Sequence, residues 1–481
     1  MTTIGQQTLA DVDAVFRDRV SRGVAPSSVW GVFDRGGLVA SGGHGDRGDG
    51  AAPDADTVYR IASCTKSVTA ATLLTLVADG RVRLDDPITD FVPAFADVAL
   101  PTPDSPTPTL RMLLTMSAGF PTDDPWADRQ ESITDDELDA VLRGGLLFDS
   151  VPGTRFAYSN LGYALLGRVV AVVAGAPFTR VATETVLRPL GLTETIFSAD
   201  AARGFVVTGV RPDAGSWERL PMTGPGAFSS IGGLFSTVGD LARWATHLAS
   251  AFSDDPAPGP VSSADRRLMQ QAQRVVPASV VPTSVRPTGY GFGLFVEQDP
   301  RFGELVSHSG GYPGFSAHMR WSVRDGLGVV AFENATQAKV SVAADQALDL
   351  VLEAHAAARP GDPSHHDAPG TGRTTDATRA AQAAVSRLLA DWNDDLADAV
   401  CTPNVAMDVP YERRRRAIAQ AVERVGADLG AAPVQEQSTA PSHLRWWLPG
   451  TSGRLRVEIR LAPLAAGRVQ TLVVTAEPAE R

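Results

Sequence analysis

Lysine and cysteine are almost absent from this chain. Its 43 basic residues include only two lysines, Lys66 and Lys339, and the others are arginine. The two cysteines, Cys64 and Cys401, lie far apart in the sequence, so a disulfide framework is excluded. Arginine stays protonated at neutral pH, whereas a desolvated lysine readily gives up its proton. A lysine in this chain is therefore a candidate for proton transfer.

Excess positive charge and long apolar runs are also missing. The formal net charge is −12, which argues against nucleic acid and an anionic membrane surface as partners. No stretch approaches about 18 uninterrupted apolar residues, so no transmembrane helix is predicted. Residues 1–7 contain neither a basic nor an apolar segment, and we therefore expect no secretory signal and a cytoplasmic location.

The length of 481 residues predicts two domains. Residues 359–376 are rich in proline, glycine and polar side chains and are expected to form a linker. It would join a large domain, residues 1–358, to a small α+β accessory domain, residues 377–481. The pair His365-His366 is interpreted as a solvated part of this linker. No metal and no cofactor are expected.

Hydrophobic periodicity predicts an α+β sandwich, in which an antiparallel sheet is flanked by helices and carries an inserted all-helical region. Helices are expected at 7–22, 110–116, 134–143, 161–173, 238–251, 342–357, 377–400 and 413–429. Strands are expected at 28–33, 38–41, 57–61, 290–297, 304–309, 314–322 and 327–334, and near 434–439, 443–448, 454–461 and 467–475.

The tetrapeptide Ser-Cys-Thr-Lys at 63–66 precedes the apolar run 67–77. In the first turn of a helix, residues three apart share a face with about 5–6 Å between their Cβ atoms, so the amine of Lys66 reaches the hydroxyl of Ser63. Unpaired backbone N–H groups lie beside it. A base and oxyanion donors are two parts of an acyl-transfer site. The alternatives are a serine N-cap followed by a solvated lysine, and Cys64 as the nucleophile.

Two further motifs carry reactive groups. Tyr158 and Asn160 precede an apolar helix, where a tyrosine can relay a proton and an amide can hold a substrate amide or the lysine. An N-cap role explains Asn160 equally well. His-Ser-Gly-Gly at 308–311 is expected at the end of a strand, where paired glycines allow a ligand to approach the backbone. Turn chemistry is the alternative there.

In this order, with about 95 and then 150 residues between them, the three motifs resemble those of the serine β-lactamase and penicillin-binding-protein superfamily. The class C β-lactamase-related branch, which includes D-alanyl-D-alanine carboxypeptidases, D-aminopeptidases and family VIII esterases, is the most similar. The stretches 152–163, 232–244 and 308–315 carry the same resemblance, which covers residues 7–357.

The resemblance implies a role for each motif residue. Ser63 matches the acylated nucleophile, Lys66 the general base and Tyr158 the proton relay. The backbone N–H groups of Ser63 and Gly311 would form the oxyanion hole. The expected substrate-binding residues are Asn160, His308, Ser309, Gly310, Gly311 and Tyr312. In a hydrolase of this kind an apolar acyl pocket would be lined by Tyr290, Phe292, Tyr312 and Phe315, although core packing explains any one of them as well.

The sequence departs from the family pattern in two places. Met116 and Ala118 stand where relatives commonly have histidine and serine, which puts local packing in question. His308 stands where many relatives have lysine, which weakens a β-lactamase interpretation because histidine is only partly charged at neutral pH.

The resulting hypothesis is a serine hydrolase that forms an acyl-enzyme on an ester or amide, of the esterase or D-amino-acid peptidase type. Its partner would be a small-molecule or peptide substrate. A peptide cyclase or acyltransferase using the same acyl-enzyme is the alternative, and a non-catalytic sensor module is a third. The layout of residues 377–481 leaves a homodimer through this domain open.

Overall fold

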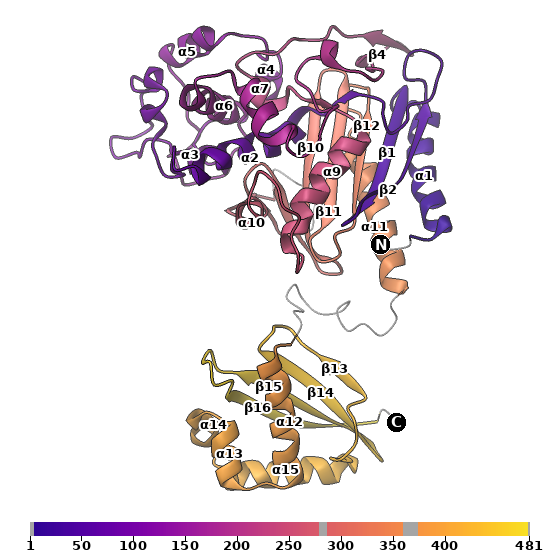
Figure 1. Ribbon diagram of the computed structural model, residues 1–481, viewed down its shortest axis with the longest axis vertical. Coiled ribbons are helices and arrows are strands. Elements are labelled where there is room, and N and C mark those ends of the chain that lie inside the picture. Colours follow the sequence, from indigo (N-terminus) through magenta and orange to yellow (C-terminus); the bar gives the residue numbers. More distant parts are fainter. Residues whose placement is uncertain (1–3, 279–285, 359–373, 480–481) are drawn as a thin grey trace. The chain divides into compact units, whose positions relative to one another are not determined.

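The computed structural model describes residues 4–278, 286–358 and 374–479, and the chain divides into two compact units, residues 1–358 and 359–481 (Figure 1). The first unit combines an antiparallel sheet with helices, and the second is a smaller α+β unit. The predicted fold class is confirmed. In the part of the chain that the structure describes, no single helix is long and apolar enough to cross a membrane, although the bent pair Asn160–Ala174 and Phe178–Leu187 meets the length and composition criteria.

An eight-stranded sheet in the order β2-β1-β12-β11-β10-β9-β8-β7 forms the centre of the first unit. Both ends of the unit contribute strands, because β1 pairs antiparallel with β12. The strands are β1 (Ser27–Asp34), β2 (Gly37–Gly45), β7 (Arg274–Val275), β8 (Thr288–Tyr290), β9 (Phe295–Asp299), β10 (Gly303–Tyr312), β11 (Phe315–Ser322) and β12 (Gly328–Glu333).

Helices cover both faces of this sheet. Helices α1 (Gln6–Ser21) and α11 (Ser341–Ala357) pack together on one face, and α9 (Val238–Ala249) lies across the other (Figure 1). Every residue of β1, β11 and β12 is consequently buried. Side chains of β1 alternate between two cores, with Val29 and Phe33 on the α9 side and Trp30 and Val32 on the α1 side, as the period of a strand requires.

A helical region lies beside one end of the sheet (Figure 1). Its main helix, α6 (Asn160–Ala174), packs against α2 (Thr65–Ala78). The other elements in this part of the chain are α3 (Leu110–Leu114), α4 (Asp124–Ala127), α5 (Asp135–Arg143), α7 (Phe178–Ala182), α8 (Ser229–Gly232), α10 (Ser263–Met269) and the short strands β3 (Tyr59–Arg60), β4 (Val210–Asp213), β5 (Ser216–Arg219) and β6 (Phe235–Ser236).

Two predicted elements of the first unit differ from the structure. The single strand expected at 290–297 is divided into β8 and β9, because Gly293 turns the chain at a φ of +73°. The strand expected to end at Ser309 continues to Tyr312 as β10, so the His-Ser-Gly-Gly motif lies within the strand. The turn that ends β10 comes later, at residues 313–314, where Gly314 has a φ of +90°.

The second unit is a four-stranded antiparallel meander backed by helices. The strands β13 (Gln435–Gln437), β14 (His443–Gly450), β15 (Gly453–Leu461) and β16 (Val469–Pro478) pair in chain order. The helices are α12 (Asp376–Ala390), α13 (Asp394–Val400), α14 (Pro403–Asp408) and α15 (Tyr411–Val425). The single helix expected at 377–400 is wrong, because the side chain of Asn393 accepts the N–H of Leu396 and starts a new helix there.

Neither tryptophan of the adjacent pair on β14 presents an exposed ring. Trp446 points into the core of the unit and is 0% exposed, and Trp447, on the other face, is only 4% exposed. The guanidinium of Arg454 covers the ring of Trp447, and its indole N–H donates to Glu477.

Candidate active site

Ser63 lies in a tight turn immediately before α2. The turn is a 3-10 segment, Ala62–Cys64, which follows the short strand β3 and leads into Thr65. Ala62 has a φ of 47°, in the left-handed region that residues with a Cβ seldom adopt. Such strain persists only where surrounding structure imposes it, and it is common at functional sites. Here the strained residue, Ala62, immediately precedes Ser63.

Strand β10 packs directly against this turn. A Cβ atom placed on Gly310 would lie 2.2 Å from the carbonyl oxygen of Ile61, so only glycine permits the approach. The next residue, Gly311, is exposed, and no atom lies within 4 Å of the position its Cβ would occupy. The backbone of Gly311 therefore borders open space beside Ser63.

Lys66 is fully buried and directed at Ser63. Its Nζ atom lies 2.9 Å from the Oγ atom of Ser63 and donates a second hydrogen bond to the carbonyl of Ile231 at 2.8 Å. Burial lowers the pKa of Lys66 to about 8, against the opposing effect of nearby carboxylates. The interpretation as a solvated lysine is therefore wrong, and the amine is poised to exchange a proton with the serine hydroxyl.

Tyr158 completes a cluster of three hydroxyl and amine groups. Its ring centre is 5.1 Å from the Nζ atom of Lys66, and burial raises the pKa of its phenol well above 10, with a hydrogen bond to Ser63 opposing that rise. The ring stacks on Phe295 of β9. Tyr158 is thus held as a neutral phenol, which is able to donate a proton at this position.

The backbone around Tyr158 is fixed by Met116. The N–H of Ala157 donates to the carbonyl of Met116, and the N–H of Ser159 donates to its Sδ atom at 3.3 Å. Met116 has a φ of 55° and is 2% exposed. The departure from the family pattern at this position therefore provides a hydrogen-bond acceptor for the segment that carries Tyr158.

Asn160 is the first residue of α6, and its neighbour Ser159 is the N-cap, whose Oγ atom accepts the N–H of Gly162. The N-cap interpretation of Asn160 is therefore wrong. Its side chain is 0% exposed, and its Nδ2 atom donates to Asp124 at 2.5 Å. The Oδ1 atom has no hydrogen-bond partner among the described residues.

His308 is buried and neutral. Its Nδ1–H donates to the carbonyl of Ser309 at 2.6 Å, so its Nε2 atom accepts from the hydroxyl of Tyr290 at 3.2 Å. Burial, followed by the charge of Lys66, lowers the pKa of His308 to about 3. Both ring nitrogens are therefore occupied within the protein, and the side chain presents no fixed positive charge to a substrate.

The side chain of Tyr312, an expected substrate-binding residue, is engaged by other protein groups. Its hydroxyl donates to Glu131 and is hydrogen-bonded to Thr223, and its ring stacks under the guanidinium of Arg60. Arg60 and Glu131 form a buried ion pair. This cluster anchors the end of β10 to the strand that delivers Ser63.

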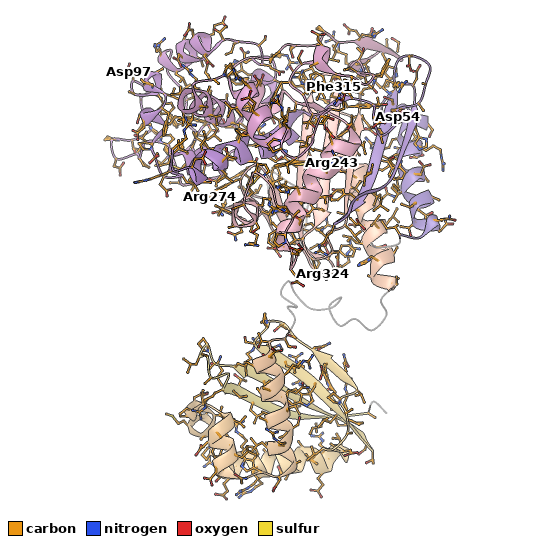
Figure 2. The ribbon with its side chains drawn as sticks, in the orientation of Figure 1. Asp54, Asp97, Arg243, Arg274, Phe315 and Arg324 are labelled. Atoms are coloured by element: carbon orange, nitrogen blue, oxygen red, sulfur yellow. The ribbon has the colours of Figure 1, made fainter. Side chains whose placement is uncertain are left out.

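The four aromatic residues expected to line an acyl pocket are buried members of the main core. Tyr290 and Phe292 are 0% exposed, and Tyr312 is 8% exposed. Phe315, which is labelled in Figure 2, begins β11 and is 2% exposed. Ser309 is exposed, although its hydroxyl is hydrogen-bonded to the Nδ1 atom of His318 at 2.9 Å.

Cys64 is not available as a nucleophile. It is 0% exposed, its thiol donates to the carbonyl of His308, and burial raises its pKa to about 12. Because the thiolate is the reactive form, this cysteine is inert at neutral pH.

Three aspartates near the site have no role in the sequence-based hypothesis. Asp123 accepts the N–H groups of Asn160 and Leu161 and so caps α6, and Asp124 and Asp128 belong to α4 and the residue after it. All three carboxylates oppose the loss of the proton from Lys66. The only signal in the sequence is that residues 121–150 are acidic and irregular. Within the described ranges, no group of three or more His, Cys, Asp or Glu side chains could hold a metal ion.

Comparisons with known proteins extend over most of the chain. Residues 12–353 match the family described as Beta-lactamase. The D-alanyl-D-alanine-carboxypeptidase/endopeptidase AmpH of Escherichia coli (strain K12) is 30% identical over 318 residues, covering 64% of this chain and 78% of that protein.

Two solved structures share the fold. The octameric penicillin-binding protein homologue from Pyrococcus abyssi gives a TM-score of 0.61 at 20% identity and covers 94% of this chain and 96% of its own. EstCE1, a hydrolase with promiscuous acyltransferase activity, gives a TM-score of 0.58 at 22% identity and covers 71% of this chain and 98% of its own.

Proposed function

Since this chain belongs to the Beta-lactamase family and is a serine hydrolase, we propose that it cleaves an ester or amide through an acyl-enzyme on Ser63. The observation that carries the proposal is the 2.9 Å separation of the Lys66 Nζ and Ser63 Oγ atoms. The pKa of Lys66, lowered by burial to about 8, makes the amine a suitable base close to neutral pH.

In the first half of the reaction, Lys66 takes the proton of the Ser63 hydroxyl while Oγ attacks the carbonyl carbon. The oxyanion develops in the open space beside Gly311, where the N–H groups of Gly311 and Ser63 are the proposed donors. The neutral phenol of Tyr158 gives its proton to the leaving alcohol or amine and recovers one from Lys66. Water then attacks the acyl-enzyme, and the same groups return the proton to Ser63.

The neutral state of His308 favours one part of the family's substrate range. A fixed cation at this position would attract a substrate carboxylate, as at the end of a D-alanyl peptide or in a β-lactam. His308 is neutral at physiological pH because burial lowers its pKa to about 3. An esterase or aminopeptidase type of reaction therefore fits this site better than carboxypeptidase or β-lactamase activity.

Labelling with a fluorescent fluorophosphonate tests the nucleophile. The full-length chain is expected to be labelled and to hydrolyse p-nitrophenyl acetate, and Ser63→Ala to lose both activities. Ser21→Ala, which changes an exposed serine at the end of α1, is the matched control. Equal labelling and turnover in Ser63→Ala and Ser21→Ala would contradict the proposal.

Transfer of the acyl group to an amine instead of water is a second candidate. The promiscuous acyltransferase activity named for EstCE1, which has the same fold, supports it. Hydroxylamine or an amino-acid amide added during ester turnover would be acylated in competition with water, and mass spectrometry would detect the product. A product ratio that does not depend on the concentration of the amine would exclude this reaction.

Location and assembly remain predictions. A cytoplasmic location is tested by cell fractionation. A homodimer through residues 377–481 is tested by comparing the full chain with a chain ending at Ala358 in light-scattering measurements. The octameric state named for the Pyrococcus abyssi homologue makes self-association worth measuring.

A further inference from the structure

In the Asn160 amide, only the oxygen lacks a hydrogen-bond partner among the described residues. A carboxylate accepts hydrogen bonds but has none to donate, so the atom that lies 2.5 Å from the Asp124 carboxylate is the Nδ2 donor. This contact fixes the orientation of the amide and consumes the donor side. The remaining atom, Oδ1, is buried and has no hydrogen-bond partner in the described part of the chain. An unpaired buried acceptor is costly, so a ligand that donates to it would gain free energy.

Carboxylates lie close to this amide and to the groups beside it, Lys66 and Tyr158. Asp124 and Asp128 are four residues apart, so they share a face of the turn formed by α4, and the N–H of Asp128 donates to the carbonyl of Asp124. Asp124 is exposed and Asp128 is partly exposed, so both are open to a ligand. Asp123 is already committed to the N-terminus of α6. The groups that remain for a ligand are therefore acceptors, and two of them are acidic.

We propose that Asn160, Asp124 and Asp128 bind the protonated α-amino group of an aminoacyl ester or amide, next to the carbonyl that Ser63 attacks. This inference rests on the proposed function, because it places the amine relative to that carbonyl. An ammonium group has three donors and no acceptor, which matches one amide oxygen and two carboxylates. Hydrogen bonds between charged partners are also stronger than neutral ones.

The position of the cluster sets the distance between the amine and the reacting carbon. Asn160 is two residues from Tyr158, whose ring lies against the Lys66 amine, and Lys66 is hydrogen-bonded to Ser63. The same carboxylates act electrostatically on Lys66. A cation bound by these carboxylates is therefore close to Ser63. The α-amine of an aminoacyl substrate lies close to the carbonyl that Ser63 attacks, whereas the amine of a long side chain lies farther from it.

Three matched substrates test this inference with the full-length chain at about pH 7, where an α-amine is largely protonated. They are the p-nitroanilides of alanine, of N-acetylalanine and of propionic acid, with both enantiomers of the first two. The alanine compound is expected to have kcat/KM at least about tenfold higher than the other two, which corresponds to about 1.4 kcal/mol. Equal values for the three compounds would overturn the inference.

Single substitutions test whether Asp128 is responsible for the preference for a free α-amine. In Asp128→Asn the preference for the free amine over the propionyl compound is expected to fall at least about fivefold, mainly through KM, and Asp128→Glu is expected to restore part of it. Asp136→Asn removes the same charge at an exposed position of α5 and serves as the control. An unchanged preference in Asp128→Asn would overturn the assignment even if the alanine compound is the better substrate.

The two proposals fail in different ways. If Ser63→Ala abolishes turnover of p-nitrophenyl acetate while the three anilides react equally, the acyl-enzyme stands and the amine site is wrong. If Ser63→Ala turns over the ester as fast as the unmodified chain, the proposed function itself is wrong.

Discussion

The Nζ atom of Lys66 lies between two oxygens, donating to the carbonyl of Ile231 at 2.8 Å and lying 2.9 Å from the hydroxyl oxygen of Ser63. The carbonyl of Ile231 holds the amine in place, so the lysine side chain does not have to change conformation before the proton is transferred. Burial disfavours the charged form of the amine, and the pKa of Lys66 is lower for this reason.

We expect the activity to follow the ionisation of Lys66. Only the neutral amine accepts a proton, and its pKa is about 8. For a neutral ester, kcat/KM should rise about tenfold per pH unit below roughly pH 8 and level off above it. Steady-state kinetics from about pH 6 to 10 measure this, and a flat profile across that range would exclude Lys66 as the base.

Lys66→Arg provides the complementary test. Arginine keeps the positive charge but does not release its proton. The loss in kcat/KM is expected to be about 10²–10⁴-fold, the usual contribution of a positioned general base. Circular dichroism should show whether the larger side chain is accommodated, because an unfolded variant would say nothing about the base.

Removal of the Asp128 charge should move this profile. The carboxylate raises the pKa of Lys66, so Asp128→Asn is expected to lower that pKa and shift the acid limb to lower pH. The pKa of Asp128 itself is raised by burial to about 7, so Asp128 is mostly ionised at the midpoint near pH 8, about half ionised at pH 7 and mostly protonated at lower pH. A shift to higher pH, or an equal shift in Asp136→Asn, would contradict this coupling.

The sequence predicted the features that depend on spacing and periodicity. The strands near β10–β12 were predicted from the sequence pattern, and the family followed from three motifs at their usual intervals. The neutral state of His308 could not be predicted, because its lowered pKa depends on burial and on the charge of Lys66, which is distant in the sequence.

Hydrogen bonds from side chains to the nearby backbone explain other differences between the predicted and observed helices. Residues 377–400 have a continuous helical pattern, yet the side chain of Asn393 captures the N–H of Leu396 and divides it. The roles of Asp124 and Asp128 depend on a short helix in an irregular segment, where no periodic pattern exists to align them with Asn160.

Met116 should affect both stability and activity. Met116→Ala removes the thioether that accepts the Ser159 N–H and leaves a cavity, and we expect the free energy of unfolding to fall by about 2–5 kcal/mol. Met116→Leu keeps most of the side-chain volume but leaves the Ser159 N–H unpaired, and we expect it to lower the free energy of unfolding by about 1–3 kcal/mol. Because the segment carries Tyr158, kcat is expected to fall in both variants. Urea denaturation and ester kinetics measure the two effects, and a Leu variant with unchanged stability would show that the sulfur contact contributes nothing.

Adjacent glycines on β10 should respond in opposite ways to the same substitution. In Gly310→Ala the new methyl would lie 2.2 Å from the carbonyl oxygen of Ile61, a backbone atom that cannot rotate away. We expect a loss of roughly 1–3 kcal/mol or more in the free energy of unfolding, the usual cost of overpacking, with displacement of the turn that carries Ser63. In Gly311→Ala the methyl meets no atom within 4 Å, so stability should be nearly unchanged while substrate turnover falls, because the methyl fills space beside the proposed oxyanion donor. Equal destabilisation of the two variants in urea titrations would show that β10 does not approach the nucleophile turn as closely as these atoms indicate.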